Sequence, residues 1–320
     1  MLKTQYTVFV PLLMMWLCFS CAPQKQDGSE LIEQTSLVTN GISPKSEALI
    51  SHTAVRVNSQ LLNGAYNLCS GAVIAPNVVL TAAHCVTSQN SNGQIVVLPG
   101  KNVTVENAFG SFFQQRVSVE RILVHEKYLS QNSCIDQKRC SVERMYSDYG
   151  RDIALLKLTS NLPREYRPAV IERDVNQVYQ QDLQFAGFGA WILRTSEEDT
   201  NQWTEMAVGR ILRKQNIQIG DADPSMGSSS DLSHRMTFEG EGSDAALCHG
   251  DSGGPIFYER NGRISIVGVS VGYPFTTERN QKEYRCARSG LKQLVATVFA
   301  TNFTFLSEGV RELAGLSLPQ

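Results

Sequence analysis

Ser252 lies between small residues in the stretch "GDSGGP", which fits the pattern G-x-S-x-G. A serine hydroxyl is a weak nucleophile and needs a neighbouring base, a role that imidazole suits because its pKa lies near neutrality. A carboxylate that holds the imidazole in one tautomer completes such a constellation. These three residue types could together cleave an acyl bond, so the question is which histidine and which acid serve Ser252.

The order of the candidates along the chain separates two kinds of serine hydrolase. In an α/β-hydrolase the nucleophilic serine precedes both its acid and its histidine. Here all of the histidines precede Ser252; they are His52, His84, His125, His234 and His249. The apolar stretches also do not alternate with helices, as a parallel sheet requires. The α/β-hydrolase interpretation is therefore excluded.

The reverse order, histidine then aspartate then serine, occurs in three local contexts. "LTAAHC" carries His84 at the end of an apolar stretch, "RDIALLKL" carries Asp152 at the start of another, and "GDSGGP" holds Ser252 between glycines. In these three motifs the chain resembles the trypsin/chymotrypsin family of serine peptidases, and the resemblance extends from about Val38 to about Phe305. Each motif is moderately to highly specific, and all three stand in the family's order.

The resemblance implies a role for each residue. His84 would act as the general base and later protonate the leaving amine, and Asp152 would orient the imidazole. Ser252 would attack the substrate carbonyl and form an acyl-enzyme, while the backbone N–H groups of Gly250 and Ser252 form the oxyanion hole. The expected function is that of a serine endopeptidase. Two alternatives stay open: a catalytically silent family member that acts as a binding protein, and a serine esterase.

The resemblance also locates the pocket for the side chain that precedes the cut bond. Its expected residues are Ala246, Leu247, Ser270 and Gly272. Ala246 would lie at the base and offers no charge for a buried Lys or Arg, which favours apolar side chains. The wall opposite Gly272 is either Gly290, which leaves a deep pocket, or Thr297, which leaves a shallow one.

A second consequence of the resemblance is activation by cleavage. The best match to a new N-terminus is "VTNG", which begins at Val38, and its α-amino group would pair with Asp251. The preceding residue is Leu37, so a protease specific for Lys or Arg is not expected to cut there. An apolar-specific enzyme, including this protein itself, fits better.

Cysteine usage favours an oxidising compartment. Two of the eight cysteines lie within the first 21 residues, which leaves an even number for disulfides. The resemblance implies the pairs Cys69–Cys85 and Cys248–Cys286, whereas Cys134 and Cys140 have no family counterpart and are expected to close an insertion before Asp152. No zinc-ligand spacing occurs, so neither a metal nor another cofactor is expected.

The N-terminus predicts export. Residues 1–21 contain an apolar run that is too short to span a bilayer but suits a secretory signal. Ser20 before Cys21 resembles the end of a bacterial lipoprotein signal, which predicts lipidation of Cys21 and an outer-membrane or periplasmic location. A cleaved ordinary signal, giving a secreted protein, and a buried N-terminal helix are the alternatives. Residues 22–37 are polar and are interpreted as a tether or propeptide.

The elements that must position the motifs are mostly strands. Short apolar stretches, several with period-two alternation, are separated by turn residues from Thr53 onward, and helical periodicity is clear only around "TNFTFLSEGVRELAGL". The class is therefore all-β with a C-terminal helix. The resemblance implies two six-stranded antiparallel β-barrels, over residues 38–165 and 166–310, followed by a tail at 311–320.

Composition limits the partners. With 42% hydrophobic and 19% charged residues and a formal net charge of -2, the chain is globular and has no basic stripe for nucleic acid. The expected partners are protein or peptide substrates and a proteinaceous inhibitor. Membrane contact is expected only through a lipid on Cys21.

Overall fold

The computed structural model describes residues 48–106, 116–130, 149–189, 207–210, 217–220, 234–239, 247, 250–272 and 292–318. Several predicted features lie outside these ranges: the signal and tether at 1–37, the new N-terminus at Val38, the pocket base at Ala246 and its alternative wall Gly290. The cysteines outside the described residues are Cys18, Cys21, Cys134, Cys140, Cys248 and Cys286.

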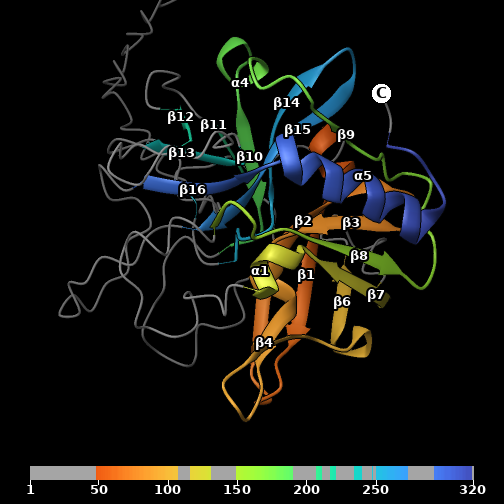
Figure 1. Ribbon diagram of the computed structural model, residues 1–320. Coiled ribbons are helices and arrows are strands. Elements are labelled where there is room, and N and C mark those ends of the chain that lie inside the picture. The colour runs from red at the N-terminus through yellow and green to blue at the C-terminus, as the bar shows by residue number, and fades with distance from the viewer. Residues whose placement is uncertain are drawn as a thin grey trace, which may run out of the picture. The chain divides into compact units, whose positions relative to one another are not determined.

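The first barrel is closed and antiparallel, with the strand order β1-β2-β3-β8-β7-β6 (Figure 1). Its strands are β1 Ala54–Gln60, β2 Tyr66–Ala75, β3 Val78–Thr81, β6 Val103–Glu106, β7 Arg116–Val124 and β8 Ala154–Leu158. Most valine, isoleucine and leucine side chains on these strands are almost fully buried. In β1 the buried Val55 and Val57 alternate with the less buried Arg56 and Asn58, as period-two patterning predicts, whereas β3 is buried on both faces. The predicted first six-stranded barrel is confirmed.

The second sheet contains eight strands among the described residues, where six were predicted. Its path is β11-β10-β14-β15-β16-β13-β12, and β9 pairs with β15 in parallel. The strands are β9 Val170–Ile171, β10 Gln184–Gly187, β11 Ala207–Arg210, β12 Gln218–Ile219, β13 Arg235–Glu239, β14 Pro255–Arg260, β15 Arg263–Gly272 and β16 Lys292–Thr297. The higher count reflects β9 and β12, each only two residues long, which no periodicity could predict.

Short elements connect the strands. They are the hairpin of β4 Thr87–Gln89 and β5 Ile95–Val97, the 3₁₀ turns η1 Leu49–His52, η2 Ala83–Val86 and η3 Gly100–Asn102, and the helices α1 Glu126–Ser130 and α4 Gln177–Gln180. Among the described residues, no helix combines the length and the apolar character needed to cross a membrane.

The predicted C-terminal helix is α5, Ala300–Ala314. It ends at Gly315, which adopts a left-handed conformation and donates its N–H to the carbonyl of Arg311. Leu306, Val310 and Leu313 recur at helical spacing and are buried. The helix contacts β3 and β8 (Figure 1), so an element that follows the second sheet in the chain covers the first barrel.

One disulfide joins Cys69 in β2 to Cys85 in η2. It closes a loop of 16 residues, which limits the freedom of the unfolded chain and stabilises the fold by roughly 3 kcal/mol. Because η2 also carries His84, the bond fixes this turn to the barrel wall.

Candidate active site

Asp152 holds His84 at two points. Its carboxylate accepts the backbone N–H of His84 at 2.8 Å, and its second oxygen lies 2.6 Å from Nδ1 of the ring. The Asp152 side chain is fully buried, whereas that of His84 is 22% exposed. A buried carboxylate with this geometry keeps the proton on Nδ1 and leaves Nε2 as the acceptor, which is the tautomer that a general base requires.

The loop before β8 that carries Asp152 is anchored to the start of α5. Buried Arg151 donates to Oδ1 of Asn302 at 2.9 Å. The amide of Asn302 donates in turn to the carbonyls of Gly150 and Thr297, both at 2.7 Å. Every polar group of the Asn302 side chain is thus paired, and these hydrogen bonds join the loop to α5.

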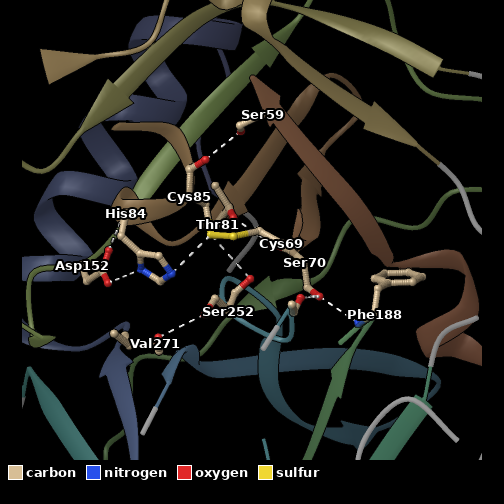
Figure 2. Close-up of a disulfide and its surroundings, with 11 residues drawn as sticks. Ser59, Cys69, Ser70, Thr81, His84, Cys85, Asp152, Phe188, Ser252 and Val271 are labelled. Atoms are coloured by element: carbon tan, nitrogen blue, oxygen red, sulfur yellow. Dashed lines mark hydrogen bonds and ion pairs between the residues drawn. A yellow bond between two sulfur atoms is a disulfide. The ribbon is translucent and has the colours of Figure 1, made fainter. Parts of the chain in front are cut away.

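Ser252 lies in a turn between Leu247 and β14, within the second sheet's part of the chain. Its hydroxyl donates to the carbonyl of Val271 at 3.2 Å, and its own carbonyl accepts the N–H of Ser70 at 2.7 Å (Figure 2). The following N–H, of Gly253, donates to the carbonyl of Ser270 at 2.7 Å. The backbone of the turn is therefore bonded to β2 of the first barrel and to β15 of the second sheet, while the hydroxyl is directed at β15 rather than at the imidazole.

The Cys69–Cys85 disulfide lies directly beside the imidazole (Figure 2). Sγ of Cys85 is 3.7 Å from Nε2 of His84. Two sulfur atoms and a ring nitrogen within 4.8 Å of one another would suit zinc by residue type. Because the sulfurs are bonded to each other, this grouping supports the position of His84 and does not provide thiolate ligands.

Asp251, the expected partner of a new N-terminus, is fully buried. Its Oδ1 accepts the N–H of Gly189 at 2.8 Å. A Cβ at Gly187 would come within 2.1 Å of the same oxygen, so only glycine allows the carboxylate to enter between the end of β10 and the serine turn. Val38 itself lies outside the described residues, and its pairing with Asp251 stays a prediction.

Three of the expected pocket residues lie within the described ranges, and two of them, Ser270 and Gly272, belong to β15. Leu247 and Ser270 are fully buried, and Gly272 has φ +139° with open space where a Cβ would stand. The strand register places Leu294 of β16 opposite Gly272 across a bulge. Thr297, one of the two expected walls, instead pairs with Gly268, which precedes Gly272 in β15.

Three histidines without an expected catalytic role lie in the described part of the chain, and His249 lies outside it. His52 ends η1, and His234 is buried next to β13. His125 is buried after β7, where its ring packs against Phe305 of α5 with centroids 5.0 Å apart. Burial and the nearby charges of Arg151, Lys127 and His234 lower the pKa of His125 from 6.5 to about 4.

This depressed pKa predicts a loss of stability in acid. The unfolded chain binds a proton at His125 below about pH 6.5, whereas the folded protein does so only near pH 4. We therefore expect the free energy of unfolding to fall by up to about 3 kcal/mol more in wild type than in His125→Asn as the pH drops from 6.5 to 4. Asparagine retains an acceptor for the N–H of Lys127, which now bonds to Nδ1 at 3.2 Å. Urea titrations at several pH values measure this difference; parallel pH profiles would contradict it.

The comparisons with known proteins agree with the sequence resemblance. The family model described as Trypsin matches residues 45–287, well over half of the chain. The chain belongs to the trypsin family. This membership confirms the expected trypsin/chymotrypsin-like serine peptidase, and it implies protein or peptide substrates.

Individual relatives of this trypsin-family chain are distant. Chymotrypsin-like elastase family member 1 of Rattus norvegicus is 28% identical over 67% of this chain and 72% of its own. The clotting factor G beta subunit of Tachypleus tridentatus is 29% identical over 66% of this chain and 64% of its own. The solved structure of HL collagenase aligns with 88% of this chain and 100% of its own, at a TM-score of 0.55 and 16% identity, which supports the fold.

Some residues that shape the site gave no sequence signal. Ser70 is an unremarkable polar residue within a strand, and Asn302 stands in an amphipathic helix, so neither could be singled out. The position of Leu294 opposite Gly272 follows only from the register between β15 and β16. The glycine pair at 187 and 189, in "FAGFGA", was the one visible sign of a close backbone approach.

Proposed function

We propose that this chain is a serine endopeptidase in which Ser252 is the nucleophile, His84 the general base and Asp152 the residue that orients the base. The observation that carries the proposal is the buried Asp152 carboxylate, which holds both the backbone and the ring of His84 beside the serine turn. A buried acid paired with a partly exposed imidazole is the arrangement that proton transfer from a hydroxyl requires.

The reaction starts by redirecting one hydrogen bond. In the resting structure the Ser252 hydroxyl donates to Val271, so attack requires a rotation of this side chain toward Nε2 of His84. Hydrogen bonds of this kind are often loose before substrate binds. Ser252 Oγ then bonds to the substrate carbonyl carbon while its proton passes to His84. The same proton leaves with the amine, and water releases the acyl group.

We place the oxyanion hole at the backbone N–H groups of Gly250 and Ser252. Gly250 has φ +100°, a conformation that favours glycine, and the turn that follows is fixed by the N–H of Gly253. Two fixed N–H donors stabilise the charge that develops on the carbonyl oxygen, and the loss of one such donor lowers the rate by about 10²–10³-fold.

For specificity, we propose a short apolar pocket. Ala246 supplies no charge at its base, and Leu294 stands opposite Gly272, where side chains of directly paired residues share one face of the sheet. A leucine at this wall reduces the depth of the pocket, which favours cleavage after Ala or Val over cleavage after aromatic residues.

The specificity proposal predicts the effect of Leu294→Ala. We expect the ratio of kcat/KM for Phe over Ala at the residue before the cut bond to rise about tenfold, because the truncation opens space beside Gly272. Leu306→Ala is the matched control: it truncates an equally buried leucine of α5, the helix that contacts β3 and β8 of the first barrel, and it should leave the ratio unchanged. Tetrapeptide p-nitroanilides measure both ratios. An unchanged ratio in Leu294→Ala would show that this residue does not line the pocket.

We further propose that the protein is exported, lipidated at Cys21 and activated by cleavage before Val38. The Cys69–Cys85 disulfide supports an oxidising compartment. The buried Asp251 carboxylate beside Gly189 supports a site for a new α-amino group. The domain limits at 38–165 and 166–310 remain part of the same proposal.

Casein hydrolysis combined with labelling by a fluorophosphonate, both carried out on the form that begins at Val38, tests the function. We expect the labelled protein to lose all casein activity, in step with the extent of labelling. A protein that cleaves esters but neither casein nor peptide amides would be a serine esterase, and one that neither cleaves nor labels would be a binding protein; either result contradicts the endopeptidase proposal.

A further inference from the structure

Ser70 belongs to β2 of the first barrel, but its hydrogen bonds lead to the other half of the site. Its fully buried hydroxyl donates to the carbonyl of Gly250 at 2.8 Å and accepts the N–H of Phe188 at 2.9 Å (Figure 2). Its backbone N–H donates to the carbonyl of Ser252 at 2.7 Å. One residue of the first barrel thus contacts the backbone at both ends of the proposed oxyanion hole.

The backbone of Gly250 needs such a constraint. Glycine has more conformational freedom than any other residue, and at φ +100° a side chain is excluded, since a Cβ would come within 2.8 Å of the Cα of Gly189. The carbonyl and the N–H of Gly250 are attached to the same Cα. They belong to different peptide units, which rotate relative to each other about φ and ψ of Gly250. A hydrogen bond that holds the carbonyl restrains the 250–251 unit and so limits concerted rotations of φ and ψ that would turn the N–H away from the substrate.

The packing leaves little room for a substitute donor. A Cβ at Gly253 would come within 2.2 Å of the Ser70 carbonyl, and one at Gly254 would come within 3.2 Å of the Ser70 Cβ. The serine turn thus packs closely against Ser70. Without the hydroxyl, the Gly250 carbonyl and the Phe188 N–H would both lose a buried partner, and a shift of the turn toward other partners would follow.

We propose that Ser70 is a positioning residue for peptide hydrolysis: its hydroxyl holds the 250–251 peptide unit, which restricts φ and ψ of Gly250 and so keeps the Gly250 N–H directed at the developing oxyanion. This inference rests on the proposed function. Ser70 belongs to the first barrel and does not contact the substrate, but it would control how well the serine turn beside the second sheet stabilises the transition state.

The test is Ser70→Ala, assayed with an alanine p-nitroanilide peptide and normalised by active-site titration. We expect kcat per titrated site to fall about 10- to 100-fold, below the full effect of a lost oxyanion donor, with KM changed less than about threefold. A peptide aldehyde ending in alaninal forms a hemiacetal whose oxygen occupies the same hole. Its Ki should rise by the same factor as kcat falls.

The control is Thr53→Val, which deletes a buried hydroxyl that donates to the carbonyl of Arg167 at 2.9 Å, away from the serine turn. It should lower the unfolding midpoint but leave kcat and the aldehyde Ki within twofold of wild type. If Ser70→Ala does not fold, Ser70→Gly deletes the same hydroxyl and is held to the same criterion.

Two results would overturn the inference in different ways. The positioning role alone would be overturned if wild type is active and a folded Ser70 variant keeps its kcat and aldehyde Ki within twofold of wild type. Wild type that hydrolyses no amide and forms no aldehyde adduct would overturn the proposed function, and this role with it.

Discussion

Ser252→Ala should lower kcat for peptide hydrolysis by about 10⁶-fold, because no other group can form the acyl bond. The same change should alter the unfolding midpoint by less than about 3 °C. The hydroxyl makes one hydrogen bond, to Val271, in a partly exposed turn whose backbone is fixed by Ser70 and Ser270. Hydrolysis rates and a thermal melt on the same preparation measure both effects.

Ser88→Ala is the control for this variant. The Ser88 hydroxyl, in the β4–β5 hairpin, accepts the N–H of Leu62 at 3.3 Å, in the loop that follows β1, so its removal should leave kcat within twofold of wild type. A Ser252→Ala protein that folds and retains peptidase activity would rule out Ser252 as the nucleophile.

Asp152→Asn should lower kcat by roughly 10⁴-fold with little change in KM. The asparagine oxygen can still accept the backbone N–H of His84, so the turn keeps its place. Its NH₂ group, however, faces Nδ1 of the ring and donates to it, which moves the ring proton to Nε2. An imidazole in this tautomer cannot accept the proton of Ser252.

Steady-state kinetics of Asp152→Asn and of Asp174→Asn separate the tautomer effect from a general effect of charge. Asp174 is an exposed acid that bonds only to nearby loop groups, so its amide variant should remain fully active. A loss smaller than about tenfold in Asp152→Asn would mean that the buried carboxylate does not control the tautomer of His84.

The sequence predicted the parts of the fold that depend on local patterns. Alternating valines and leucines indicated the strands of the first barrel. The order of the three motifs along the chain was enough to indicate the family. The eight-stranded second sheet was not predictable, because β9 and β12 are too short to show a period. The contact of α5 with β3 and β8 was not predictable either. An amphipathic pattern predicts that one face of a helix is buried, but not which element it packs against.

For the candidate site, too, the sequence suggested some residues and could not suggest others. His84, Asp152 and Ser252 stand in short motifs, so the sequence could suggest them, and the structure brings His84 and Asp152 together. The residues that support them act through long-range hydrogen bonds: Ser70 is 180 residues from Gly250, and Arg151 is 151 residues from Asn302. Pairs of this kind depend on tertiary packing, which no local pattern in a single sequence encodes.

The most direct test of the account is to locate the fluorophosphonate adduct by peptide mass spectrometry. The experiment uses the full chain and a form that begins at Val38, each compared with its Ser252→Ala counterpart. We expect one adduct per active molecule, on Ser252 alone, and loss of peptidase activity in proportion to labelling. An adduct on any other residue, or peptidase activity that survives complete labelling of Ser252, would contradict it.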